Sequence, residues 1–171
     1  MRAGQQWCLC ASRWQEAFDA GAFAVAVALA ASGCGPATHY KYRIAVIPKG
    51  LTHEFWQSIH HGPDRAAADL GKHGSPDDVL WDGPAKERDS LEQIKLIETK
   101  AVMGINGLVL APQDSVQMVK PVQQVVEKHI PVVIIDSGLD KDALAKNPDL
   151  IVKYVATDNY HGGQLAAERL L

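Results

Sequence analysis

Short apolar segments alternate with longer amphipathic segments along most of the chain, starting at residue 42. The apolar segments are rich in β-branched residues, which is typical of strands. They span 42–48, 78–81, 107–110, 131–135 and 151–156. The amphipathic segments place apolar residues at helical spacing, and they span 55–70, 90–103, 115–129 and 160–171. Strands that alternate with helices predict an α/β protein with a doubly wound parallel sheet.

Local signals refine this pattern at several positions. The segment 131–135 (PVVII) has no polar alternation, which indicates a strand covered on both faces, as in a parallel sheet. Pro63 is expected to kink the first helix or to split it in two. Asp114 is placed as the N-cap of the helix that follows it. The polar segment 140–149 ends in an Asn-Pro-Asp cluster and is interpreted as a loop.

Composition limits the class of protein without identifying it. The chain has 171 residues and a formal net charge of −3, so no basic character points to nucleic acid. Its length fits one domain, or one domain and a leader. No apolar run reaches the roughly 18 residues that a membrane-spanning helix needs.

The first 33 residues have the pattern of a secretory signal. The apolar run 21–31 (GAFAVAVALAA) follows Arg2 and Arg13 and precedes the small residues before Cys34. A buried helix of the fold is the alternative interpretation. The sequence ending at Cys34 (ASGC) resembles the lipobox of bacterial lipoproteins, which implies lipidation of this cysteine. We therefore assign 1–33 to a lipoprotein-like signal peptide and 34–41 to a linker.

Ligands of doubly wound sheets bind at the carboxyl ends of the strands, so the polar residues there are the candidate site. These residues lie in 49–55, at Asp82, and in 113–115, 136–138 and 158–159. Asp114 and the pair Asp136-Ser137 follow two buried strands. A carboxylate at such a position either caps the next helix or accepts hydrogen bonds from two hydroxyl groups of a polyol.

Aromatic and amide side chains add to the candidate site. Phe55 and Trp56 are adjacent on a helix and point about 100° apart, so we expect one ring in the core and the other at the cleft. Both rings in the core is the alternative. Asp158 or Asn159 is expected to cap the last helix.

Motifs for catalysis or for cofactor binding are not found in the sequence. No HExxH, GxSxG or phosphate-loop motif is present, and the adjacent His60 and His61 diverge on a helix. We therefore expect no metal, no cofactor and no enzymatic activity. A small α/β enzyme that uses Asp114 and Asp136 is the alternative from a different functional class.

Five segments in register carry a resemblance to a known family. They are 44–48 (IAVIP), 53–56 (HEFW), 109–114 (VLAPQD), 130–137 (IPVVIIDS) and 156–163 (ATDNYHGG). In this order they resemble the periplasmic sugar-binding proteins of ABC transporters, of the ribose-binding type. The resemblance implies two similar α/β lobes that are joined by a hinge and close over a monosaccharide.

The resemblance also implies roles for single residues. Phe55 and Trp56 match the aromatic pair that stacks on the sugar, and Asp114 matches the acidic residue that binds sugar hydroxyls. The pair Asp136-Ser137 matches cleft-facing polar residues at the first hinge crossing. His53 lies where related sequences often have asparagine, and it belongs to the expected ligand-binding set. Asp158 and Asn159 match the turn at the hinge.

The family likeness predicts the organisation and the partners of the protein. We expect a first lobe at 42–138 and the start of a second lobe, cut short, at 139–171. A sugar, a transporter permease and the membrane, through the lipid anchor, are the expected partners, at the extracytoplasmic face or in the periplasm. The alternatives are a ligand-binding sensor domain for a membrane receptor and a LacI-like regulator.

Overall fold

A single parallel sheet forms the centre of the described part of the chain. The computed structural model describes residues 42–72 and 78–170. The strands follow one another in the sheet as β2-β1-β3-β4-β5, and all four pairings are parallel. They are β1 (Arg43–Ile47), β2 (Asp78–Trp81), β3 (Gly107–Leu110), β4 (Val132–Ile135) and β5 (Lys153–Val155). The predicted α/β class and parallel sheet are therefore confirmed.

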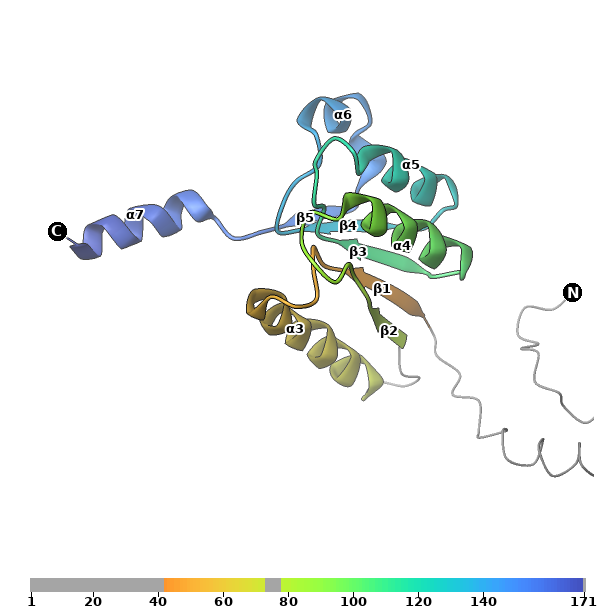
Figure 1. Ribbon diagram of the computed structural model, residues 1–171, viewed down its shortest axis with the longest axis horizontal. Helices are drawn as coiled ribbons and strands as arrows, with labels where there is room; N and C mark the ends of the chain where they lie inside the picture. Colours follow the sequence, from red (N-terminus) through yellow and green to blue (C-terminus); the bar gives the residue numbers. More distant parts are fainter. Residues whose placement is uncertain (1–41, 73–77, 171) are drawn as a thin grey trace, which may run out of the picture. The chain divides into compact units, whose positions relative to one another are not determined.

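Helices cover the two faces of this sheet unequally, as Figure 1 shows. The helices α4 and α5 lie on one face, whereas α3 lies on the other face beside β1 and β2. The helices are α3 (Glu54–Gly71), α4 (Ser90–Val102), α5 (Val119–Glu127), α6 (Lys141–Lys146) and α7 (Asn159–Leu170), with the 3-10 helix η1 (Pro148–Leu150). No residue of α7 is buried.

The main core lies between the sheet and the helices α4 and α5. Its members are apolar side chains from β1, β3 and β4, from both helices and from the segments around α6. Ile47, Ile97, Leu110, Val122 and Ile134 are almost fully removed from solvent. Burial of each side chain of this size contributes about 1.5–3 kcal/mol of transfer free energy. Because these side chains come from β1, β3 and β4, this layer stabilises the part of the sheet that carries the strand ends.

The segment 140–149 is not a loop, and the expectation from sequence was wrong here. It contains the helix α6 and most of η1, and the Oδ1 atom of Asp140 accepts a hydrogen bond from the amide of Ala143 at 2.9 Å. Leu139 and Leu150 belong to the core cluster. Because β5 pairs with β4, the first sheet extends to Val155, beyond residue 138, and the division into two lobes stays a prediction.

Two helices differ in detail from the expectation: α3 at its internal proline, and α5 at its start. The helix α3 continues from Glu54 through Pro63 without a break, so the expected split does not occur. The helix α5 begins at Val119, with Met118 as its N-cap. Asp114 instead caps the turn before it, because its Oδ1 atom accepts from the amides of Val116 and Gln117 at 2.9 and 2.7 Å.

The predicted signal segment, the linker and Cys34 lie outside the described residues. Within the described residues no helix is long and apolar enough to cross a membrane.

Candidate functional site

The strand order places a crevice at the carboxyl ends of β1 and β3. From β1 the chain crosses to β2 on one side, and from β2 it crosses back over β1 to β3 on the other side. Such a reversal separates the loops that follow the two central strands, and ligands of open α/β sheets bind there. Lys49 follows β1, Gln113 and Asp114 follow β3, and Asp136 and Ser137 follow β4.

Three of these side chains form a connected polar cluster. The Nζ atom of Lys49 lies 2.7 Å from the Oδ2 atom of Asp136 and also donates to the Oγ atom of Ser137. The Oγ atom of Ser137 in turn donates to the Oδ2 atom of Asp136 at 2.9 Å. The side chains of Lys49 and Asp136 are 21% and 33% exposed, so the pair faces solvent while it is partly shielded.

The backbone at Asp136 has a conformation that a residue with a side chain rarely adopts. Its φ angle is +63°, and the amide of Ser137 donates to the carbonyl of Ile135 across it, which makes a tight turn directly after β4. The Asp136 carbonyl accepts from the hydroxyl of Tyr154 at 3.0 Å. Such strained positions occur where a site needs a side chain at a fixed place.

The two adjacent aromatic residues occupy different environments, as the helical spacing predicted. Trp56 is 2% exposed, and its Nε1 atom donates to Glu87 at 2.5 Å, whereas Phe55 is 47% exposed. The rings meet edge to face with centroids 4.9 Å apart. Phe55 is therefore the aromatic face that is open to a ligand.

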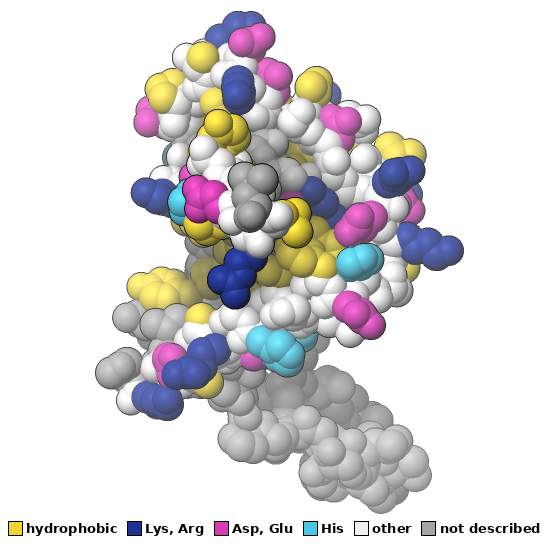
Figure 2. Space-filling view, turned by 90° about the vertical axis from the view of Figure 1, so that its left-hand side faces the viewer, with side chains coloured by type: hydrophobic (Ala, Val, Ile, Leu, Met, Phe, Trp, Pro, Cys, Tyr) yellow, Lys and Arg dark blue, Asp and Glu magenta, His cyan; other side chains and the backbone are white. Residues whose placement is uncertain are grey.

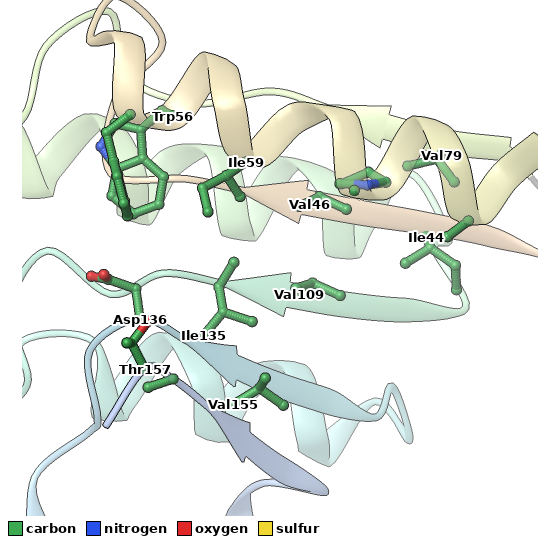
Figure 3. Close-up of a pocket in the computed structure, with 15 residues that line it drawn as sticks. Ile44, Val46, Trp56, Ile59, Val79, Val109, Ile135, Asp136, Val155 and Thr157 are labelled. Carbon is green, nitrogen blue, oxygen red and sulfur yellow. The ribbon is translucent and has the colours of Figure 1, made fainter. Parts of the chain in front are cut away.

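An open hollow of about 670 Å³ lies along the sheet face beside α3. Trp56 and Asp136 lie at one end of it, at the carboxyl ends of the strands (Figure 3). The rest is lined mainly by apolar side chains, among them Val109, Ile135 and Val155. Figure 2 shows apolar side chains gathered in a recess with charged side chains around it. Only the end with the carboxylate has the polarity that a sugar needs.

The structure brings part of the predicted set together. Phe55, Trp56 and Asp136 line one hollow, and Ser137 is bonded to Asp136. The other predicted residues lie at the same edge but do not line this hollow, and they make local hydrogen bonds or are exposed. They are His53, Asp114, Asp158 and Asn159.

Local hydrogen bonds account for most of these remaining side chains. The Nδ1 atom of His53 accepts from the amide of Phe55 at 3.1 Å, which stabilises the start of α3. Asp158 accepts from the amide of His161 at 2.9 Å, so the expected N-cap of α7 is confirmed. A capping oxygen leaves the second carboxylate oxygen of Asp114 or Asp158 available to a ligand.

Sequence analysis included Lys49 among the residues after the first strand and Thr157 within a segment of the family resemblance, but it gave neither a role in the ligand site. Thr157 lines the hollow next to Val155, and Lys49 is the cation of the polar cluster. Both lie two residues after the end of a strand, so their place at this edge follows from the rule about strand ends, whereas their partners do not. Among the described residues no group of three or more His, Cys, Asp or Glu side chains is arranged to hold a metal ion.

The chain is similar to known protein families over most of its length. The sequence model of the family described as "Periplasmic binding protein domain" matches residues 44–171. A second model, of an uncharacterized protein family conserved in bacteria, matches residues 1–42.

Relatives that bind sugars are similar over the same region. The chain is 33% identical to a D-ribose/D-allose-binding protein of Pseudomonas aeruginosa over 133 residues, which are 78% of this chain and 40% of that protein. A D-allose-binding periplasmic protein of Escherichia coli is 32% identical over 127 residues, which are 74% and 39% of the two chains. The chain thus spans about two fifths of the length of these relatives.

A solved structure supports the same assignment. An ABC transporter solute-binding protein of Agrobacterium vitis with bound D-fucose superposes with a TM-score of 0.63 at 36% identity, and the match covers 74% of this chain and 41% of that one. The family model covers three quarters of the residues. The chain therefore belongs to the periplasmic binding protein family.

Proposed function

We propose that this chain contributes to the substrate-binding component of a sugar ABC transporter. In this proposal it binds a monosaccharide at the carboxyl edge of its sheet, in the periplasm, and presents it to a permease. Relatives named for D-ribose and D-allose binding support the substrate class. The same proposal assigns binding without chemical conversion of the sugar.

One observation carries this proposal most directly. The partly exposed cluster of Lys49, Asp136 and Ser137 lies at the polar end of a hollow that Phe55 and Trp56 also line. Carboxylate and hydroxyl oxygens accept hydrogen bonds from sugar hydroxyls, and the ammonium group donates to sugar oxygens. The exposed ring of Phe55 offers an apolar surface for the C–H side of a sugar ring.

A titration by NMR tests the proposal on the 171-residue protein. D-allose and D-ribose are added into the millimolar range, because a cleft between two lobes would supply more contacts than one strand edge does. We expect the amide signals of Lys49, Asp136 and Ser137 to shift in a saturable way, with the sugar signals unchanged over hours. Shifts scattered over the surface, or none, would contradict the proposal.

A matched pair of substitutions makes the titration specific. Asp136→Asn removes the carboxylate at the site, and we expect it to weaken sugar binding at least tenfold. Asp142→Asn makes the same chemical change at an exposed position of α6, and it should leave the titration unchanged. Equal effects of both substitutions would show that the response does not come from the strand ends.

Export and lipid anchoring are a separate part of the proposal. The apolar run before Cys34 supports a signal peptide, and the ASGC sequence supports lipidation of that cysteine. The match of residues 1–42 to another bacterial family is the competing assignment for this segment. Labelling of cells with a fatty-acid analogue decides between them. Label that is lost on Cys34→Ala supports the anchor, and an unlabelled wild-type protein excludes it.

A further inference from the structure

A buried glutamine lies directly beneath the crevice between β1 and β3. Gln93, on the first turn of α4, is fully buried, and it is the one buried polar residue in the described part of the chain. Burying a side-chain amide without hydrogen-bond partners costs free energy, so a buried glutamine is expected to have its hydrogen bonds satisfied.

Gln93 makes three hydrogen bonds, and all of them go to backbone groups at strand ends. Its Nε2 atom donates to the carbonyls of Pro48 and Ala111, at 3.1 and 2.9 Å. Its Oε1 atom accepts from the amide of Gln113 at 3.0 Å. One side chain therefore bridges the loop after β1 and the loop after β3.

These three hydrogen bonds lie just beyond the point where the pairing of β1 with β3 ends. The pairing of β1 with β3 ends at Ile47 and Leu110, where the amide of Ala111 still donates to the carbonyl of Ile47 at 2.9 Å. Beyond this point the segments that follow β1 and β3 are no longer paired with each other. Pro48 and Ala111 are buried, so their carbonyls need a donor other than water. The Gln93 amide supplies that donor to both.

A second glutamine extends the bridge to the polar cluster. The Nε2 atom of Gln113 donates to the carbonyl of Lys49 at 2.6 Å, while its Oε1 atom is buried without a hydrogen-bond partner among the described residues. The Lys49 side chain then pairs with Asp136, and Gln113 directly precedes Asp114. The two amides thus hold the backbone of residues on both sides of the crevice.

We propose that Gln93 is a positioning residue for the ligand site, which fixes the separation of the loops that carry Lys49 and Asp114. It touches no ligand itself and acts through the backbone of Pro48, Ala111 and Gln113. The effect on sugar affinity rests on the proposed function. The effect on loop order does not, because it concerns the protein without ligand.

The substitution Gln93→Leu tests the proposal, since leucine is similar in size and removes all three hydrogen bonds. Amide hydrogen exchange of the 171-residue protein is measured by NMR without ligand. We expect the amide of Gln113 to exchange at least tenfold faster, and the signals of Lys49 and Asp114 to shift. Gln93→Asn keeps an amide group but is one methylene shorter, so it should weaken the three hydrogen bonds and accelerate the same exchange by a smaller factor.

The control is a change in the same helix that weakens the core alone. Ile97→Val lies on the same side of α4 and is fully buried, but it makes no bond to the loops. If Ile97→Val accelerates exchange at Gln113 as much as Gln93→Leu does, at equal loss of melting temperature, Gln93 is only a structural residue. If Gln93→Leu fails to fold, the comparison of Gln93→Asn with Ile97→Val decides in the same way.

Sugar titration provides the second measurement. If the wild-type protein binds D-allose, Gln93→Leu should weaken binding at least tenfold and Ile97→Val less than twofold, and equal weakening would overturn the positioning role. If the wild-type protein binds neither D-allose nor D-ribose, the proposed function fails. The exchange experiment then still decides whether Gln93 orders the two loops.

Discussion

At the scale of single residues, the ion pair between Lys49 and Asp136 connects the loops after β1 and β4. The two residues are far apart in the sequence, and their side chains meet because parallel strands end at one edge. A partly buried ion pair with a shared hydroxyl partner holds both loops more firmly than an exposed pair does. Local order at the site therefore depends on this contact.

Replacement of Lys49 by methionine should expose this dependence. Lys49→Met keeps most of the volume but leaves the Asp136 carboxylate without its cation, so we expect the free energy of unfolding to fall by about 1–2 kcal/mol. Denaturation in urea measures the change. Lys95→Met, at an exposed position of α4, serves as the control. If the two variants lose equal stability, the ion pair contributes nothing.

Two glycines provide a second contrast between residues of the same type. Gly62 lies inside α3, and a Cβ atom there would meet nothing within 4 Å. Gly62→Ala should change the free energy of unfolding by less than about 0.5 kcal/mol, because the smaller loss of backbone entropy is offset by the contact of an alanine Cβ with the ring of Pro63, which follows it in the helix.

At Gly50 the same substitution should be clearly destabilising. A Cβ atom there would lie 3.1 Å from the backbone nitrogen of Glu87 and 3.3 Å from the carbonyl carbon of Lys86. Backbone atoms cannot move aside as flexible side chains do, so Gly50→Ala should lower stability by about 1 kcal/mol or more. Thermal unfolding of both variants, at one protein concentration, checks the pair. Equal effects would contradict the packing at this loop.

At the scale of elements, a side-chain cap defines the start of α4. Asp89 is its N-cap, and its Oδ1 atom accepts from the amide of Glu92 at 3.0 Å. Asp89→Ala should therefore lower the free energy of unfolding by about 1 kcal/mol. Because Gln93 lies one turn further on, the variant should also accelerate amide exchange at Gln113. Glu98→Ala, on the exposed side of the same helix, should change neither quantity.

The strands could be predicted from the sequence because their apolar runs are short and bounded by polar segments. The runs at 78–81 and 107–110 match β2 and β3 in full, and the other strands lie inside their predicted ranges. The helix α6 was missed because its six residues are too few for helical periodicity to appear, and Asn147 and Pro148 after it favour a loop. Short elements depend on packing, here of Leu139 and Leu150.

The candidate site was predictable only in part, for a related reason. Asp136 and Phe55 could be found because each follows from a local rule, namely the end of a strand and the spacing on a helix. The pairing of Lys49 with Asp136 and the burial of Gln93 depend on the three-dimensional arrangement. A glutamine on a helix suggests a solvent-exposed position in the sequence, and only the divergence of β1 and β3 gives it a buried role.

At the scale of the whole described region, one face of the sheet is incompletely covered. The helix α3 lies beside β1 and β2, and the apolar side chains of β3, β4 and β5 on that face line the open hollow. Val155, at the end of β5, lines this hollow and is 54% exposed, whereas Val152 is 67% exposed and lies outside it. Exposed apolar surface of this kind binds apolar dyes and promotes self-association.

A pair of valine substitutions tests whether this hollow is the apolar surface that the protein presents to solvent. Val155→Glu places a charge in the hollow, so we expect it to reduce the fluorescence of the bound dye ANS by about half and to reduce light scattering at high concentration. Val152→Glu introduces the same charge on the neighbouring segment, outside the hollow. It should change dye binding little, because net charge alone acts weakly on an apolar dye site. A similar decrease in both variants would mean that the charge, and not the hollow, controls dye binding.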